Sequence, residues 1–180
     1  GYTAVANGAV AYGAGVTGQA VQLNGSDAYI SVAGVGITGA APRTIAGWAK
    51  ADSLGIAEWT NVFGFTGPSG NGGHFDIEAV GTTDNTTLGY YGLHRYEWHH
   101  LAGTYDGTTA RWYGDGMLIG SAVVDPTGVN TPGLIHIGKR QDNTNFFPGL
   151  ADEIRIYDRA LSDGEIAWLA GKRMPTHKPL

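Results

Sequence analysis

The stretch EWHHLAGTYDGTTARWYGDGMLIGSAVV, residues 97–124, decides the fold of this chain. Two Asp-Gly pairs, Asp106-Gly107 and Asp115-Gly116, each separate runs that are rich in aromatic and β-branched residues. Asp-Gly favours a tight hairpin turn because both residues tolerate a positive φ angle. The stretch therefore predicts three antiparallel strands joined by two tight turns.

Short strand-like runs separated by turn residues continue on both sides of this stretch. Further strands are predicted within residues 19–23, 28–34, 43–51, 59–67, 74–80, 133–140 and 150–158. Many short strands with frequent turn signals are typical of a two-sheet sandwich. One short helix is predicted over residues 161–171, where Ser162 and Glu165 form a capping-box pattern and Gly171 follows as a stop signal.

The composition agrees with an all-β domain and excludes several function classes. The 180 residues include 30 glycines, and only 15% of them are charged. A formal net charge of −5 argues against a nucleic-acid partner, and no apolar run is long enough for membrane insertion. There is no cysteine for a disulfide framework. We expect one domain over residues 1–171, followed by a tail or linker over 172–180.

The order of the motifs resembles that of the laminin G-like domains in the concanavalin A-like lectin/glucanase superfamily. The resemblance covers about residues 18–170 and rests on Trp-His-His at 98–100, Thr-Tyr-Asp-Gly at 104–107 and Asp-Glu-Ile-Arg-Ile-Tyr at 152–157. It implies an antiparallel jelly-roll sandwich, in which two curved sheets stack face to face, with one short C-terminal helix.

The strand HFDIE, residues 74–78, places His74, Asp76 and Glu78 on one face. Retaining glucanases of the resembled superfamily carry Glu-x-Asp-x-Glu on a strand, and His74 stands where their nucleophile would be. Because a retaining mechanism needs two carboxyl groups in these roles, the motif does not predict an enzyme. Two interpretations stay open: a polar strand face open to solvent, or a ligand-facing sheet whose polar groups bind sugar hydroxyls.

Loop residues complete the predicted ligand site. Flat aromatic rings cover the apolar face of a sugar, while amides and carboxylates bind its hydroxyls. The loop residues with these properties are Trp59, Tyr90, Tyr91, His94, Tyr96, Asp142, Asn143 and Asn145. Trp48 and Trp98 are expected to pack in the core, where the resembled family has them, and Trp168 is expected to dock the helix on the sandwich.

A calcium site is the second prediction. Members of the resembled family often bind a structural Ca²⁺ near the aspartate that corresponds to Asp152, with oxygens from the turn after the opening strand. That turn is NGSD here, so the predicted ligands are Asn24, the Gly25 carbonyl, Asp27 and Asp152. The alternative is that Asp152 accepts hydrogen bonds from backbone N–H groups, as turn aspartates often do.

These observations predict a non-catalytic, extracellular carbohydrate-binding module of the lectin type, with a polysaccharide or glycan as its partner. One alternative is a structural or adhesive module of a virion or cell-surface assembly, whose low charge would suit close packing against other subunits. The other alternative is a glycoside hydrolase, which would lose its activity on Glu78→Gln.

Overall fold

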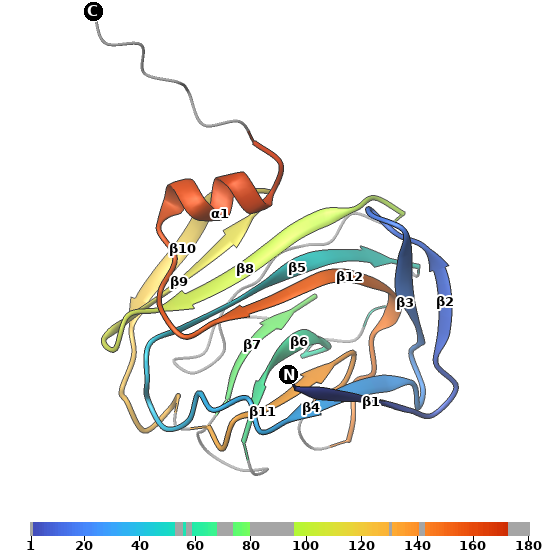
Figure 1. Cartoon of the computed structure of the whole chain (residues 1–180), viewed down its shortest axis with the longest axis horizontal. Coiled ribbons are helices and arrows are strands. Elements are labelled where there is room, and N and C mark those ends of the chain that lie inside the picture. The colour runs from blue at the N-terminus through green and yellow to red at the C-terminus, as the bar shows by residue number, and fades with distance from the viewer. Residues whose placement is uncertain are drawn as a thin grey trace, which may run out of the picture.

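Two antiparallel sheets face one another across a shared core (Figure 1). The structure is a computed structural model, and it describes residues 2–52, 56, 59–67, 74–79, 96–129, 131–140 and 143–172. The predicted all-β sandwich with one short helix is confirmed. No helix in these described ranges has the length and apolar character to cross a membrane.

The first sheet has five strands in the order β1-β4-β11-β6-β7. Their bounds are β1 Thr3–Asn7, β4 Tyr29–Ala33, β11 Leu134–Ile137, β6 Asn61–Thr66 and β7 Phe75–Glu78. Alternate residues of the central strands, such as Phe63 and Phe65 on β6 and Ile135 on β11, point into the core and are fully buried. The intervening residues therefore face the outside of the sandwich.

The second sheet has seven strands in the order β10-β9-β8-β5-β12-β3-β2. Their bounds are β10 Met117–Val123, β9 Thr109–Gly114, β8 His99–Tyr105, β5 Arg43–Ala51, β12 Pro148–Tyr157, β3 Gln19–Asn24 and β2 Ala11–Ala14. The meander that residues 97–124 predict is present as β8, β9 and β10, with Asp115 (φ 48°) and Gly116 (φ 75°) at the second turn.

Aromatic rings join the two sheets at the centre of the core. Phe65 and Phe75, from the five-stranded sheet, have ring centroids 6.2 Å apart, and Phe75 lies 6.4 Å from Tyr105 of β8. Gly103 of β8 faces this cluster, since a Cβ there would meet the Phe75 ring at 3.3 Å. Close packing of large rings against a small residue holds the sheets together.

Helix α1, Asp163–Leu169, lies on the outer face of the seven-stranded sheet (Figure 1). The predicted capping box is confirmed, because the Ser162 hydroxyl accepts from the Glu165 N–H and the Glu165 carboxylate accepts from the Ser162 N–H. Leu161 and Ile166 are the buried residues through which this segment packs on the sheet. The helix ends before Gly171, which has a φ of 75°.

Two strands were not predicted from the sequence. Strand β1 pairs with β4 and β2 pairs with β3, so both lie at sheet edges. Most of their residues are exposed, including Val5 and Tyr12. Without a buried face there is no alternation of apolar and polar residues for a sequence pattern to report.

Candidate functional site

The polar residues of the HFDIE strand lie on the outer face of the five-stranded sheet. Phe75 and Ile77 point into the core, so His74, Asp76 and Glu78 face outward, as predicted. They are nevertheless buried, with exposed fractions of only 8, 2 and 3%. The interpretation of a strand face open to solvent is therefore wrong, whereas ligand binding by these residues stays a prediction.

Neighbouring strands supply polar partners to this buried face. The Asn61 side-chain amide donates to Asp76 Oδ2 at 2.6 Å. On β6, Gly64 lies opposite Asp76, and a Cβ on Gly64 would lie 2.1 Å from the Asp76 Cβ. Only glycine at this position allows the Asp76 side chain to fit above β6. The arrangement is a hydrogen-bonded, packed polar layer.

Lys139, just after β11, contacts the Tyr29 ring of β4 and the Asn143 side chain in the loop that follows. Its ammonium lies 4.1 Å from the centroid of the Tyr29 ring and donates to the Asn143 side-chain oxygen at 2.5 Å. The His136 ring meets Tyr29 edge-on at 5.6 Å. Burial, with a smaller contribution from Lys139, lowers the pKa of His136 to about 4, so its ring is neutral at pH 7.

The described loop residues of the predicted ligand site each have contacts of their own, and their role in binding stays a prediction. Trp59 is half-buried with the Arg140 guanidinium 5.6 Å from its ring centroid, and Asn143 is held by Lys139. Tyr96 is 62% exposed, and its N–H donates to the Ala51 carbonyl at the end of β5. Asn145 is half-buried in a left-handed conformation with φ 50°. Tyr90, Tyr91, His94 and Asp142 lie outside the described residues.

The four predicted calcium ligands are divided between two places. Asn24 Oδ1 accepts from the N–H groups of Ser26, Asp27 and Ala28, and the Asn24 amide donates to Asp27 Oδ1 at 2.7 Å. Asn24 pairs with Pro148 across β3 and β12, and Asp152 lies four residues further along β12. At about 3.3 Å per residue, the backbone positions of Pro148, opposite Asn24, and of Asp152 are about 13 Å apart.

The Asp152 carboxylate has backbone partners of its own. Oδ1 accepts from the Glu153 N–H at 2.8 Å and Oδ2 accepts from the Thr17 N–H at 3.0 Å. This is the alternative in which Asp152 binds backbone N–H groups. Asn24, Gly25, Asp27 and Asp152 thus do not fit a single ion, and the described residues contain no cluster of three acidic or histidine side chains suited to a metal. Calcium binding by the domain stays a prediction.

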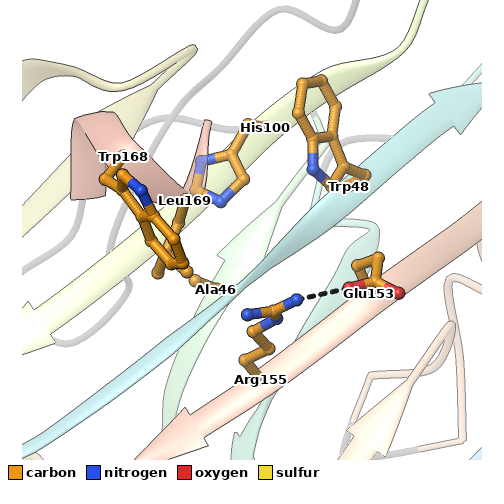
Figure 2. A pocket seen from close by; sticks show the side chains of 7 residues that line it. All are labelled: Ala46, Trp48, His100, Glu153, Arg155, Trp168 and Leu169. Atoms are coloured by element: carbon orange, nitrogen blue, oxygen red, sulfur yellow. Dashed lines mark hydrogen bonds and ion pairs between the residues drawn. The ribbon is translucent and has the colours of Figure 1, made fainter. Parts of the chain in front are cut away.

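A pocket that the sequence did not predict lies on the outer face of the seven-stranded sheet, beside helix α1 (Figure 2). Its volume is about 120 Å³. The lining residues come from β5, β8, β12 and the helix, and they are Ala46, Trp48, His100, Glu153, Arg155, Trp168 and Leu169. The two tryptophans lie on opposite sides of it, one on the sheet and one on the helix (Figure 2).

Both tryptophans differ from their expected roles. Trp48 is half-buried on the outer face, and its ring meets the His100 ring edge-on at 5.4 Å. Its expected place in the core is wrong, because the core-facing neighbour on β5 is Ala49. Trp168 is 63% exposed and does not dock the helix. Large exposed aromatic side chains beside a pocket are typical of binding surfaces.

The helix position is fixed by contacts that leave Trp168 free to face the pocket. The Tyr113 hydroxyl donates to Asp163 Oδ1 at 2.9 Å at the start of the helix. The Thr44 hydroxyl donates to the Arg159 carbonyl and accepts from the Leu161 N–H, which anchors the segment before the helix. These bonds and the buried Ile166 orient the short helix without using Trp168.

A β-bulge in β12 supplies the polar side of the pocket. The register between β12 and β5 shifts between Asp152 and Arg155, and Glu153 has a φ of 50°. Because of this shift, Asp152 does not share a face with Ile154 and Ile156, and only the two isoleucines pack against the core. Bulges redirect side chains, and this one places Arg155 opposite Ala46 on the pocket side.

Charges in the pocket balance one another. The Arg155 guanidinium donates to Glu153 Oε2 at 2.6 Å. Burial lowers the pKa of His100 to about 4, with a further lowering by Arg155, so the imidazole is neutral at pH 7. Glu153 is the one carboxylate among the residues that line the pocket. Two aromatic rings with paired polar groups suit binding of an uncharged ligand, whereas glycoside hydrolysis needs a second carboxyl group.

Comparison with known proteins identifies the family. The sequence profile described as the concanavalin A-like lectin/glucanases superfamily matches residues 24–167. The chain belongs to this superfamily. The resemblance that the motifs indicated is thereby confirmed, and the match includes every β strand of the domain except β1, β2 and nearly all of β3. No curated protein sequence matches the domain.

Solved structures share the lectin-like fold. Domain 4 of AbnA, a GH43 extracellular arabinanase from Geobacillus stearothermophilus in complex with arabinotriose, is 23% identical with a TM-score of 0.76, covering 94% of this chain and 87% of that chain. The binding domain of Paraclostridial Mosquitocidal Protein 1 is 18% identical (TM-score 0.64), and the receptor-binding domain of botulinum neurotoxin C/D mosaic serotype is 14% identical (TM-score 0.67). Each covers 94% of this chain, which spans about half of either toxin chain.

Proposed function

We propose that this superfamily member is a non-catalytic, extracellular carbohydrate-binding module, and that its glycan binds in the pocket between Trp48 and Trp168. The observation on which this proposal rests is the exposed Trp168 ring, which lies across the pocket from Trp48. The Arg155–Glu153 ion pair also lines this pocket. Rigid aromatic area with a few fixed polar groups is the usual composition of a site for an uncharged sugar.

The relatives support the same class of function. Domain 4 of the arabinanase was solved with arabinotriose, and that enzyme is described as extracellular. The two toxin domains are described as binding domains. A non-catalytic role agrees with His74 at the nucleophile position of the glucanase motif and with the single carboxylate in the pocket. Arabinose-containing glycans are therefore the first ligands to test.

Replacing Trp168 by alanine is expected to weaken glycan binding at least about tenfold, because buried aromatic contacts commonly contribute about 2 kcal/mol to binding. Calorimetry with arabino-, xylo- and cello-oligosaccharides of one to six residues measures this change. Tyr2→Ala is the matched control, since Tyr2 is 62% exposed but is not among the residues that line the pocket. The proposal fails if no glycan binds, or if Trp168→Ala binds as tightly as the wild type.

An adhesive or structural role is the second candidate, and strand β10 favours it. This edge strand exposes apolar side chains: Met117, Leu118, Ile119 and Val123 are 41–76% exposed. It has no charged residue, and such edges pair readily with other chains. The glycan-binding proposal expects a monomer in multi-angle light scattering. A defined oligomer that Leu118→Lys dissociates would favour the adhesive role.

A further inference from the structure

A second aromatic contact lies on the same sheet face as the pocket. Lys50 follows Trp48 by two residues on β5, so both side chains point to the outer face. The Lys50 ammonium lies 5.5 Å from the centroid of the Trp98 ring. Trp98 immediately precedes β8, where His99 and His100 pair with Ala49 and Trp48. Continuing this register places Trp98 opposite Lys50, in the row next to the pocket.

Trp98 and Lys50 are accessible from solvent. Both are half-buried, as Trp48 is, and Trp98 does not belong to the core cluster between the sheets. The expectation that Trp98 packs in the core is therefore wrong. Within the described ranges Lys50 forms no ion pair, and its ammonium contacts the indole ring instead. An aromatic ring with an adjacent donor repeats the chemistry of the pocket.

The spacing shows what kind of ligand can reach both contacts. Ala46 and Ala102 form the row at the helix end of the pocket, and Trp98 lies four residues from Ala102 along the chain. At about 3.3 Å per residue this is about 13 Å, and His100 at the near end of the pocket is two residues, or about 7 Å, from Trp98. The pocket of about 120 Å³ is smaller than the 300–1,000 Å³ of a typical small-molecule site. A ligand that fills both places is therefore a chain of linked units.

We propose that Trp98 and Lys50 form a second subsite, so that the domain binds a linear oligosaccharide along the β5–β8 strand pair. This inference rests on the proposed glycan-binding function of the pocket. One unit of the chain occupies the pocket between Trp48 and Trp168. A later unit contacts the Trp98 ring through its apolar face, and the Lys50 ammonium donates a hydrogen bond to one of its oxygens.

Affinity as a function of ligand length tests the second subsite. The wild type, Trp98→Ala and Trp168→Ala are titrated with the same arabino-, xylo- and cello-oligosaccharides of one to six residues. Trp168→Ala is expected to weaken binding at every length. Trp98→Ala is expected to leave the shortest binding ligand unchanged and to weaken the longest about tenfold. Lys50→Met, which keeps the apolar stem, is expected to weaken only the long ligands, about threefold.

Each outcome supports or overturns the inference. Equal effects of Trp98→Ala at all lengths, or no effect at any length, would overturn the second subsite while the pocket proposal stands. If Trp168→Ala loses binding and Trp98→Ala does not, the second subsite is likewise overturned and the pocket proposal stands. If no oligosaccharide binds the wild type, both proposals fall together. Trp98→Phe keeps an aromatic ring and is expected to retain most of the length dependence, which separates a contact with the ligand from a general loss of packing.

Discussion

Replacing Asp152 by alanine is expected to lower the free energy of unfolding by about 3 kcal/mol and to weaken glycan binding in the pocket. The carboxylate is 8% exposed and accepts from the Glu153 and Thr17 N–H groups. Hydrogen bonds to charged groups contribute about 1.5–3 kcal/mol each, and unpaired buried donors add to the cost. Thermal and urea unfolding measure the stability, and calorimetry measures the binding.

The binding loss follows from the bulge. Asp152 Oδ1 accepts a hydrogen bond from the Glu153 N–H, and the Glu153 carboxylate forms an ion pair with Arg155 at the pocket. Glu153→Gly separates the two effects, because glycine adopts the positive φ of this position without strain but lacks the carboxylate. The free energy of unfolding of this variant is expected to lie within about 1 kcal/mol of the wild-type value. Its affinity for the glycan is expected to be lower. Unchanged binding in both variants would contradict a role for the bulge in the site.

EDTA distinguishes hydrogen bonding by Asp152 from calcium binding. Because both Asp152 oxygens have backbone partners, we expect EDTA to change the melting temperatures of the wild type and of Asp152→Ala by the same amount, if it changes them at all. If EDTA lowers the wild-type value and has no effect on Asp152→Ala, then Asp152 is a calcium ligand and its bonds to N–H groups are secondary. Asp152→Asn keeps one acceptor oxygen and is expected to lie between the wild type and alanine in stability.

Strands with many apolar residues or with Asp-Gly turns beside them could be predicted from sequence, whereas the edge strands β1 and β2 could not. Residues 43–51 and 97–124 are rich in apolar, aromatic and β-branched residues, and the Asp-Gly turns in 97–124 predict how its strands are connected. Strands β1 and β2 expose most of their residues, so their positions depend on pairing with β4 and β3. The sequence of such a strand contains little information about a partner that is distant in the chain.

The candidate site was harder to predict because a tryptophan on a strand has the same pattern in a core and on a surface. Trp48 alternates correctly with its neighbours, and only the side of the sheet decides its role. Trp168 occupies a helix whose buried side is provided by Ile166. Glu153 could have drawn attention only through its left-handed conformation, which a sequence does not report. The site combines elements from both halves of the chain.

Acidification from pH 7 to pH 5 is expected to lower the free energy of unfolding by about 4 kcal/mol, about 2 from each of two buried histidines. Burial is the main cause that lowers the pKa of His100 and of His136 to about 4. In the unfolded chain each imidazole takes up its proton near pH 6.5. Below that pH the unfolded state binds more protons than the folded state, so stability falls as the pH approaches 4.

Burial decides the direction for both rings, and nearby charges modify it. Burial lowers the pKa of His100 most; the nearby Asp115 raises it by a smaller amount, and Arg155 lowers it by the smallest amount. His136 faces Lys139, which also disfavours protonation. In the described part of the chain, Nδ1 of each ring has no hydrogen-bond partner that could accept an added proton. Protonation therefore places an uncompensated charge in a buried site.

The capping carboxylate Glu165 does not contribute to the change expected between pH 5 and pH 6.5. Glu165, paired with Arg159 and hydrogen-bonded by Ser162, has its pKa lowered to about 2 and titrates well below this range. Thermal unfolding at a series of pH values is expected to show a fall in Tm on the order of 10 °C between pH 7 and pH 5. The double variant His100→Gln, His136→Gln is expected to show a much flatter profile over the same range. A profile that is equally steep in the double variant would assign the acid sensitivity to other groups.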